Sequence, residues 1–153
     1  MSLAKKGFKI TVIYGVISGL FLAALLKLVE LTTRLKVYTL LLNVDYIPFV
    51  NTVAFPELIE LGFHLIVSIA LAVSLYLLII YRKIQNEKQL ILICTAVCFI
   101  IGAALFPTTA FSDRTPDSTS MPSFAYWIAG HILYGYLLGV LFARQINQWK
   151  VRF

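Results

Sequence analysis

The sequence predicts an all-helical membrane protein, a bundle of four transmembrane helices, from its apolar composition, its long uncharged stretches and the placement of its basic residues. Of 153 residues, 60% are hydrophobic and 13% are charged, about half the ~25% charged fraction of a typical soluble domain. Each of four stretches approaches or exceeds the ~20 residues that a helix needs to cross a bilayer. These stretches are 10–26, 61–81, 89–112 and 118–143. A soluble protein is excluded, and residues 1–153 are expected to form a single integral membrane domain in contact with lipid.

The basic residues alternate with the uncharged stretches in a pattern that predicts an orientation. Nine of the thirteen precede the first stretch, separate the second from the third, or follow the fourth: Lys5, Lys6, Lys9, Arg82, Lys83, Lys88, Arg144, Lys150 and Arg152. By the positive-inside rule, both termini are expected in the cytoplasm. The net charge of +6 therefore orients the chain and contacts anionic headgroups, and we expect no nucleic-acid partner.

The first helix is expected to begin near Lys5, to cross the membrane over about 8–30, and to run on to about Lys36. Lys27, Glu30 and Arg34 follow at spacings that let them pair along one helix face. The connection 37–55 is apolar but interrupted by asparagine, aspartate and proline. It is too short and broken to span, so we expect an interfacial amphipathic segment that lies on the outer leaflet or folds over the mouth of the bundle.

The remaining spans are bounded by clear local signals. Pro56 is expected to open a helix over about 57–81, with Glu57 and Glu60 complementing its positive end. A turn of about five residues leads to a span over about 89–107, which predicts antiparallel neighbours. The polar outer loop 108–122 carries Ser, Thr and two of the prolines, and the last span follows over about 123–143.

Small or polar residues recur at every fourth position in each predicted helix. The glycines among them are Gly15, Gly19, Gly102, Gly135 and Gly139. Helices in lipid associate through close backbone approach at small residues and through the hydrogen bonds of a few polar ones. These positions are therefore expected to face the interior of the bundle.

The ionisable residues of the spans lie on the same stripes. Glu60, His64 and His131 are expected to converge in the outer half of the bundle as a cluster that responds to protons or a ligand. Lys27, Glu30 and Glu57 supply supporting interfacial charges. The alternative is structural: the histidines hydrogen-bond between helices, and Glu60 is a charge at a helix start.

Four short motifs resemble the YagU-like small inner-membrane proteins of bacteria. They are GVISGLFLAALLKLVE at 15–30, FHLIVSI at 63–69, FP at 106–107 and GHILYG at 130–135. The resemblance implies a bacterial inner-membrane location, a multi-pass domain of unknown function and a link to acid-stress survival. The family's recurring positions correspond here to Lys27, Glu30, His64 and His131. The first outer connection of this chain is shorter than in the family.

Three functions remain open on the sequence. The first is a pH-responsive unit that conducts ions, protons or a small solute, and the second a structural or assembly subunit, with a homo-oligomer expected in either case. In the third, His64 and His131 supply both axial ligands of a haem. No serine nucleophile with a base, phosphate loop or carboxylate pair stands out, so no enzyme is expected. Too few ligands gather for a metal site, and we expect no cofactor.

Overall fold

The computed structural model describes residues 3–45 and 55–150. Four long helices dominate it, and a short helix and a 3₁₀ turn lie between them. The elements are α1 (Leu3–Thr33), α2 (Val37–Leu42), α3 (Glu57–Tyr81), α4 (Glu87–Leu105), η1 (Phe106–Phe111) and α5 (Met121–Lys150). The part of the chain that the structure describes contains no strand.

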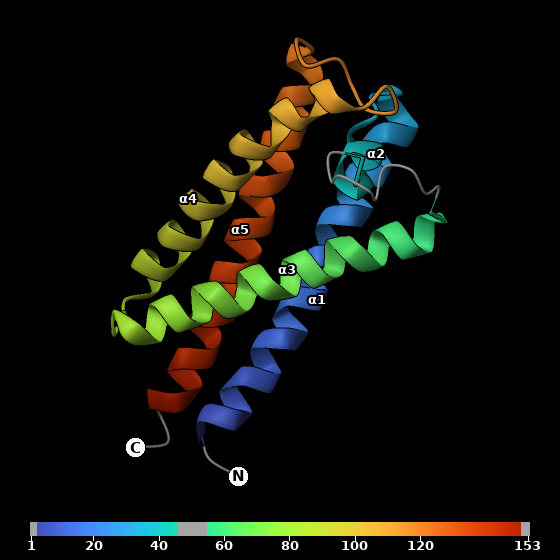
Figure 1. Cartoon of the computed structure of the whole chain (residues 1–153). Helices are drawn as coiled ribbons and strands as arrows, with labels where there is room; N and C mark the ends of the chain where they lie inside the picture. Colours follow the sequence, from blue (N-terminus) through green and yellow to red (C-terminus); the bar gives the residue numbers. More distant parts are fainter. Residues whose placement is uncertain (1–2, 46–54, 151–153) are drawn as a thin grey trace.

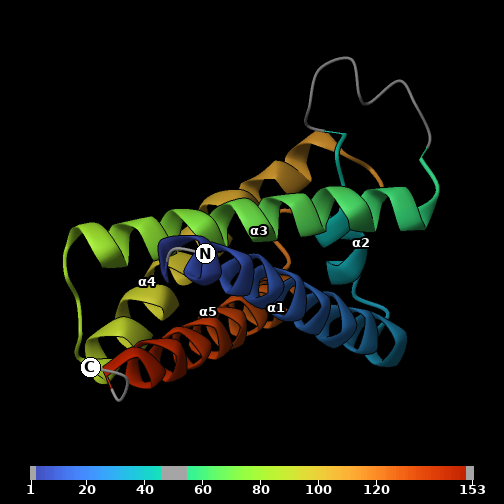
Figure 2. The ribbon, with the colours of Figure 1, turned by 90° about the horizontal axis from the view of Figure 1, so that it is seen from below.

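Helix α1 stands at the centre of the packing. It packs against α3 and α5, and α4 packs along α5. Figures 1 and 2 show α3 crossing α1 obliquely, while α4 and α5 run close together. The start of α1 and the end of α5 lie at the same end of the bundle, which we name the terminal end (Figure 1). The opposite end, where α2 and η1 lie, is the loop end.

The arrangement of α3 and α4 differs from the sequence-based expectation. The turn between them is short, yet α3 packs mainly on α1, and α4 packs mainly on α5. The two helices diverge from their shared turn toward the loop end (Figure 1). A short connection thus joins two helix pairs instead of building a hairpin, because each helix finds its closest partner elsewhere.

All four long helices are long and apolar enough to cross a membrane. The candidate spans are Gly7–Thr33, Glu57–Tyr81, Glu87–Phe111 and Met121–Ile146. Large apolar side chains remain exposed along them, as at Leu31, Leu58, Leu92 and Ile100. An apolar surface of this extent is stable against lipid tails and not against water. The chain is therefore a multi-pass membrane protein.

The connection after α1 begins earlier than expected and agrees with only one of its two expected placements. Helix α1 ends at Thr33, short of Lys36, because Arg34 adopts a left-handed backbone with φ 64°. Four of the six residues of α2 are buried, including Val37 and Leu40, and α2 packs against α1 and α3. Burial on this scale fits a segment that folds over the mouth of the bundle, one of the two expected placements, and not one that lies on the outer leaflet. The rest of the predicted segment, 46–54, lies outside the described residues.

Helix contacts depend on glycine at several places. A Cβ at Gly15 would lie 2.8 Å from Ile69 Cα, and one at Gly139 would lie 2.7 Å from Ile91 Cα. These distances are shorter than real carbon contacts, so only glycine allows the backbones to approach so closely. Toward the terminal end the buried side chains are mostly apolar, with Leu75, Leu138 and Phe142 fully buried or nearly so, and the polar Thr11 and Gln145 are buried beside them.

Candidate functional site: an apolar cavity with two histidines

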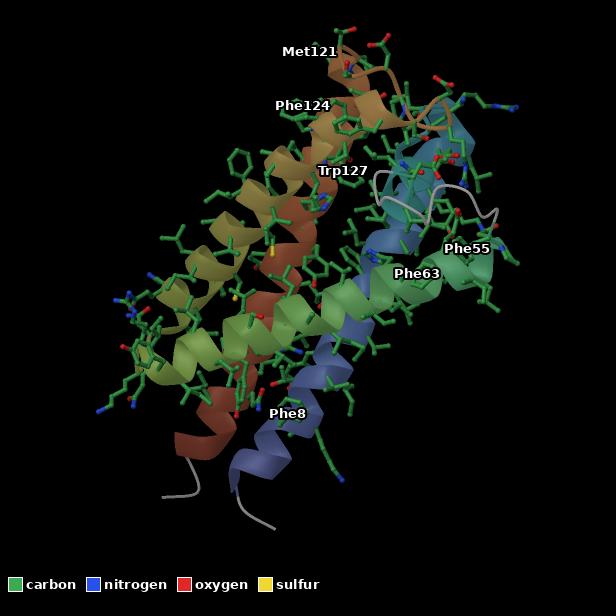
Figure 3. The ribbon with its side chains drawn as sticks, in the orientation of Figure 1. Phe8, Phe55, Phe63, Met121, Phe124 and Trp127 are labelled. Atoms are coloured by element: carbon green, nitrogen blue, oxygen red, sulfur yellow. The ribbon has the colours of Figure 1, made fainter. Side chains whose placement is uncertain are left out.

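A cavity of about 300 Å³ lies in the loop-end half of the bundle, at the lower end of the size range of small-molecule sites. Every helix contributes to its wall, which is mostly aliphatic and aromatic. Figure 3 labels two of the wall residues, Phe63 on α3 and Trp127 on α5. The polar residues of the wall are Asn43, His64, Ser68, Thr108, His131 and Tyr134.

The two histidines reach this cavity from different helices, and each is hydrogen-bonded to a backbone carbonyl. His64 Nε2 lies 3.1 Å from the carbonyl oxygen of Gly19, and His131 Nδ1 lies 2.9 Å from that of Trp127. A carbonyl oxygen only accepts, so each ring donates its N–H at that nitrogen. In a neutral ring the second nitrogen is then an acceptor.

His131 is further fixed by its neighbours on α4 and α5. Its ring centroid lies 4.3 Å from that of Trp127, and the Trp127 Nε1–H donates to the carbonyl oxygen of Gly102 at 2.8 Å. A Cβ at Gly102 would lie 2.7 Å from His131 Cγ. The glycine therefore makes the space that the imidazole occupies between the two helices.

A hydrogen-bonded link closes the cavity toward the terminal end. Ser68 Oγ donates to the carbonyl oxygen of Gly15 at 2.7 Å. The hydroxyl of Tyr134 lies 2.9 Å from Ser68 Oγ and donates to it, because the hydrogen of Ser68 is already given to Gly15. This link joins α1, α3 and α5. Among the described residues, the wall extends no further toward the terminal end than Leu71 and Tyr134 on their helices.

Glu60 does not join the histidines, although the sequence placed all three in one cluster. Its carboxylate accepts from Arg114 Nη1 at 2.9 Å and from Nη2 at 3.2 Å. It lines a second, polar pocket of about 330 Å³ at the loop end. The structure thus brings His64 and His131 to one cavity and places Glu60 in a separate ionic network.

The three supporting charges lie around that second pocket, but with partners other than the expected ones. Lys27 Nζ lies 2.6 Å from Glu57 Oε1, which also accepts from the Tyr38 hydroxyl at 2.8 Å. Burial and the bond to Glu57 raise the pKa of Tyr38. Glu30 accepts from the backbone N–H of Tyr38 at 2.8 Å and of Thr39 at 2.9 Å. Pairing along α1 with Arg34 is absent from the described contacts.

Sequence reasoning did not identify Arg114, Asp45 or Tyr38 as partners in this network. Arg114 lies in a polar loop, far along the chain from the carboxylates it contacts, and no periodic pattern links it to them. Asn43 stood out only as an interruption of an apolar run. Ser68 lies on the predicted stripe, one helical turn after His64, but its hydrogen bond with Tyr134 was not predicted.

The two histidines are the candidate ligands of a metal or a haem in this cavity. Across residues 3–45 and 55–150, no group of three His, Cys, Asp or Glu residues converges as a metal site. Axial ligation of a haem by both histidines would require a free nitrogen directed to the iron from each ring. His64 Nε2 and His131 Nδ1 are held by backbone carbonyls, which leaves His64 Nδ1 and His131 Nε2 as the nitrogens that such ligation would use.

No family model, curated protein or solved structure matches this chain. The resemblance to YagU-like inner-membrane proteins therefore stays a prediction from the sequence motifs.

Proposed function

We propose that this membrane protein binds a lipophilic small molecule in the cavity between α3 and α4. The observation that carries the proposal is an apolar cavity of about 300 Å³ whose wall includes residues of the lipid-facing surface. Ile66 and Val67 line the cavity, yet they are 64% and 58% exposed on α3. A ligand dissolved in the membrane can therefore enter sideways, without crossing the headgroups.

The same geometry favours binding over conduction. An ion crossing the membrane needs polar groups or water along its whole route. The described wall contains no charged residue. The large buried side chains between the cavity and the terminal end, among them Leu75, Leu138 and Phe142, are apolar, and the buried polar side chains there, such as Thr11 and Gln145, are uncharged. An apolar cavity that opens toward the lipid but does not continue to the terminal end has the form of a binding site.

Fluorescence quenching in lipid nanodiscs tests this proposal. The chain has two tryptophans, so a Trp149→Phe background leaves Trp127, which lines the cavity, as the only tryptophan. A probe with a brominated fatty chain should quench the fluorescence of Trp127, and the quenching should reach a plateau as the probe concentration rises. Val67→Phe, which puts a larger side chain into the wall and so narrows the cavity, should weaken this quenching.

Leu77→Phe is the matched control, since Leu77 is 57% exposed on the same helix and is absent from the described wall. It should leave the quenching curve unchanged. Quenching that rises linearly with probe and is the same in all three proteins would mean collision from bulk lipid and would refute the binding site.

A pH-responsive role is the second candidate, and it is favoured by the two histidines in one cavity. Histidine has an unperturbed pKa of about 6.5, near mild acid. Protonation of both rings would place two cations in an apolar chamber and would disfavour the closed packing. Proton and ion flux from liposomes at about pH 7 and about pH 5 tests this candidate. Flux at the lower pH that is lost in a His64→Ala/His131→Ala variant would support it, and equal flux in both proteins would reject it.

We also propose a bacterial inner-membrane location with both termini in the cytoplasm. The support is the basic residues that flank the spans on one side, and the positive-inside rule. A green fluorescent protein fused after Phe153 should fluoresce in cells, and alkaline phosphatase fused there should be inactive. The reverse pattern would invert the topology. Acid-stress survival and a homo-oligomer stay predictions. Gly15, Gly19, Gly135 and Gly139 are already used in contacts within one chain.

A further inference from the structure

We infer that the ligand of the cavity is an uncharged lipophile with a carbonyl group, and that the side-chain amide of Asn43 donates a hydrogen bond to that carbonyl. The inference rests on the proposed function, because it names the chemistry of the molecule bound in the same cavity. Three observations support it: one buried donor lacks a hydrogen-bond partner, the other donors of the wall already donate within the protein, and the described wall has no charged residue.

Asn43 is the residue that follows α2 and caps its end. It is 2% exposed and lines the cavity. Its Oδ1 accepts from the backbone N–H of Asp45 at 3.3 Å. Its Nδ2 is buried and has no hydrogen-bond partner in the described structure. Buried amide groups are nearly always hydrogen-bonded, and an unpaired one costs free energy, so a missing acceptor is expected at this position.

The other conventional polar donors in the described wall already donate within the protein. They are His64, Ser68, Thr108, Trp127, His131 and Tyr134. Their acceptors are backbone carbonyls and, for Tyr134, the hydroxyl of Ser68. The Asn43 amide is thus the strong donor that remains for a ligand, and it selects a molecule with an acceptor oxygen.

The charge of the wall selects an uncharged molecule. Among its described residues there is no Lys, Arg, Asp or Glu. The nearby cations are engaged elsewhere, Lys27 with Glu57 and Arg114 with Glu60. A carboxylate or an ammonium group would therefore enter an apolar site without a counter-ion, which is strongly unfavourable. An ester or a ketone carbonyl satisfies the amide without that cost.

Four probes of equal non-hydrogen atom count separate these features: tetradecane, methyl undecanoate, methyl undecyl ketone and dodecanoic acid. Each competes with the brominated probe for the Trp127 site in nanodiscs of the Trp149→Phe protein. The change of interest is Asn43→Leu, which keeps the approximate size of the side chain but removes its amide. A given probe partitions to the same extent into nanodiscs of either protein, because the lipid is the same. The ratio of its affinities for the two proteins therefore isolates the contribution of the amide.

In the Asn43→Leu protein, the ester and the ketone should each bind about fivefold to tenfold more weakly, while tetradecane should bind with unchanged affinity. A loss for only one of the two carbonyl probes would support the inference for that class of carbonyl and overturn it for the other. Ester and ketone affinities that are unchanged in Asn43→Leu would overturn the inference and leave the proposed function standing. Tighter binding of ionised dodecanoic acid than of the ester would overturn the inference that the ligand is uncharged.

The failures of the two proposals are distinguishable. If no probe competes in the wild-type cavity, the proposed function itself fails. If Asn43→Leu weakens tetradecane as well, the loss for the ester and the ketone relative to the loss for tetradecane decides, because tetradecane reports only the changed shape of the cavity. A greater loss for the carbonyl probes than for tetradecane supports the inference, and equal losses overturn it.

Discussion

The guanidinium of Arg114 holds the buried carboxylate of Glu60 through two hydrogen bonds, of 2.9 and 3.2 Å. Arg114 Nη1 also lies 3.7 Å from Asp45 Oδ1, and Asp45 Oδ2 accepts from Ser112 Oγ at 2.6 Å. The bond to Glu60 raises the pKa of Arg114, so the arginine stays charged. This network ties the loop after η1 to α3 and to the segment after α2.

Arg114→Gln is expected to destabilise the protein, because Glu60 is 4% exposed and would lose its counter-ion. Hydrogen bonds to charged groups contribute about 1.5–3 kcal/mol. The Arg114 side chain is 47% exposed, so water screens the pair, and we expect a loss of about 1–2 kcal/mol. Thermal unfolding in detergent measures it as a lower Tm.

Arg82→Gln is the control for that prediction. Arg82 is exposed and forms no ion pair with the described residues, so its replacement should leave the Tm unchanged. Adding Glu60→Gln to Arg114→Gln should recover part of the lost stability, because the unpaired buried charge is then removed. No recovery in the double variant would show that the ion pair is not the source of the effect.

The spans could be predicted from the sequence because lipid imposes a simple length and composition rule on each helix. Helix α3 covers Glu57–Tyr81 as expected, with Pro56 just before it, and α4 gives way to η1 at Phe106. The end of α1 could not be predicted, because the carboxylate of Glu30 binds the amides of α2 instead of a side chain on its own helix.

The site was only partly visible in the sequence. The stripe of small and polar residues correctly brought His64 and His131 toward one interior, and both line the cavity. The position of Glu60 on the same stripe was misleading. Glu60 lies one helical turn before His64, which places it at the loop end, where Arg114 from a distant loop binds it. Helical periodicity gives the face of a residue and not its partner from elsewhere in the chain.

Glu30→Ala is expected to loosen α2. The carboxylate accepts the backbone N–H groups of Tyr38 and Thr39, and also the hydroxyl of Thr39 at 2.8 Å, so it caps the first turn of a six-residue helix from α1. Loss of a cap costs about 0.5–2 kcal/mol. Hydrogen exchange at the Tyr38 and Thr39 amides should become faster by a corresponding factor. Glu30→Gln, which keeps an acceptor oxygen, should lie between the wild type and Glu30→Ala, and equal exchange in all three would contradict the capping role.

Alkaline pH should destabilise the protein partly through Tyr38. Burial, together with the nearby Glu57, raises its pKa in the folded state above the ordinary value of about 10. From about pH 10 upward, the unfolded chain therefore releases this proton while the folded chain keeps it, and the free energy of unfolding falls with pH. The contribution is fully present below that pH and is lost as the pH rises through the folded-state value. Thermal unfolding across this range should show a shallower decline in Tyr38→Phe than in the wild type, and parallel declines would contradict the assignment.

Two glycines on different helices should respond to alanine in opposite ways. A Cβ at Gly135 would lie 2.7 Å from the carbonyl oxygen of Cys94 and 2.8 Å from Thr95 Cα, whereas one at Gly62 would meet nothing within 4 Å. Both residues are within helices, where alanine is intrinsically favoured over glycine by about 0.8–1.0 kcal/mol. Gly62→Ala should therefore be neutral or stabilising. Gly135→Ala must push α4 away from α5, at a cost of about 1–3 kcal/mol for overpacking, and its Tm should fall. Similar Tm values for the two variants would mean that α4 and α5 do not approach as closely in the membrane as their backbone contact at Gly135 requires.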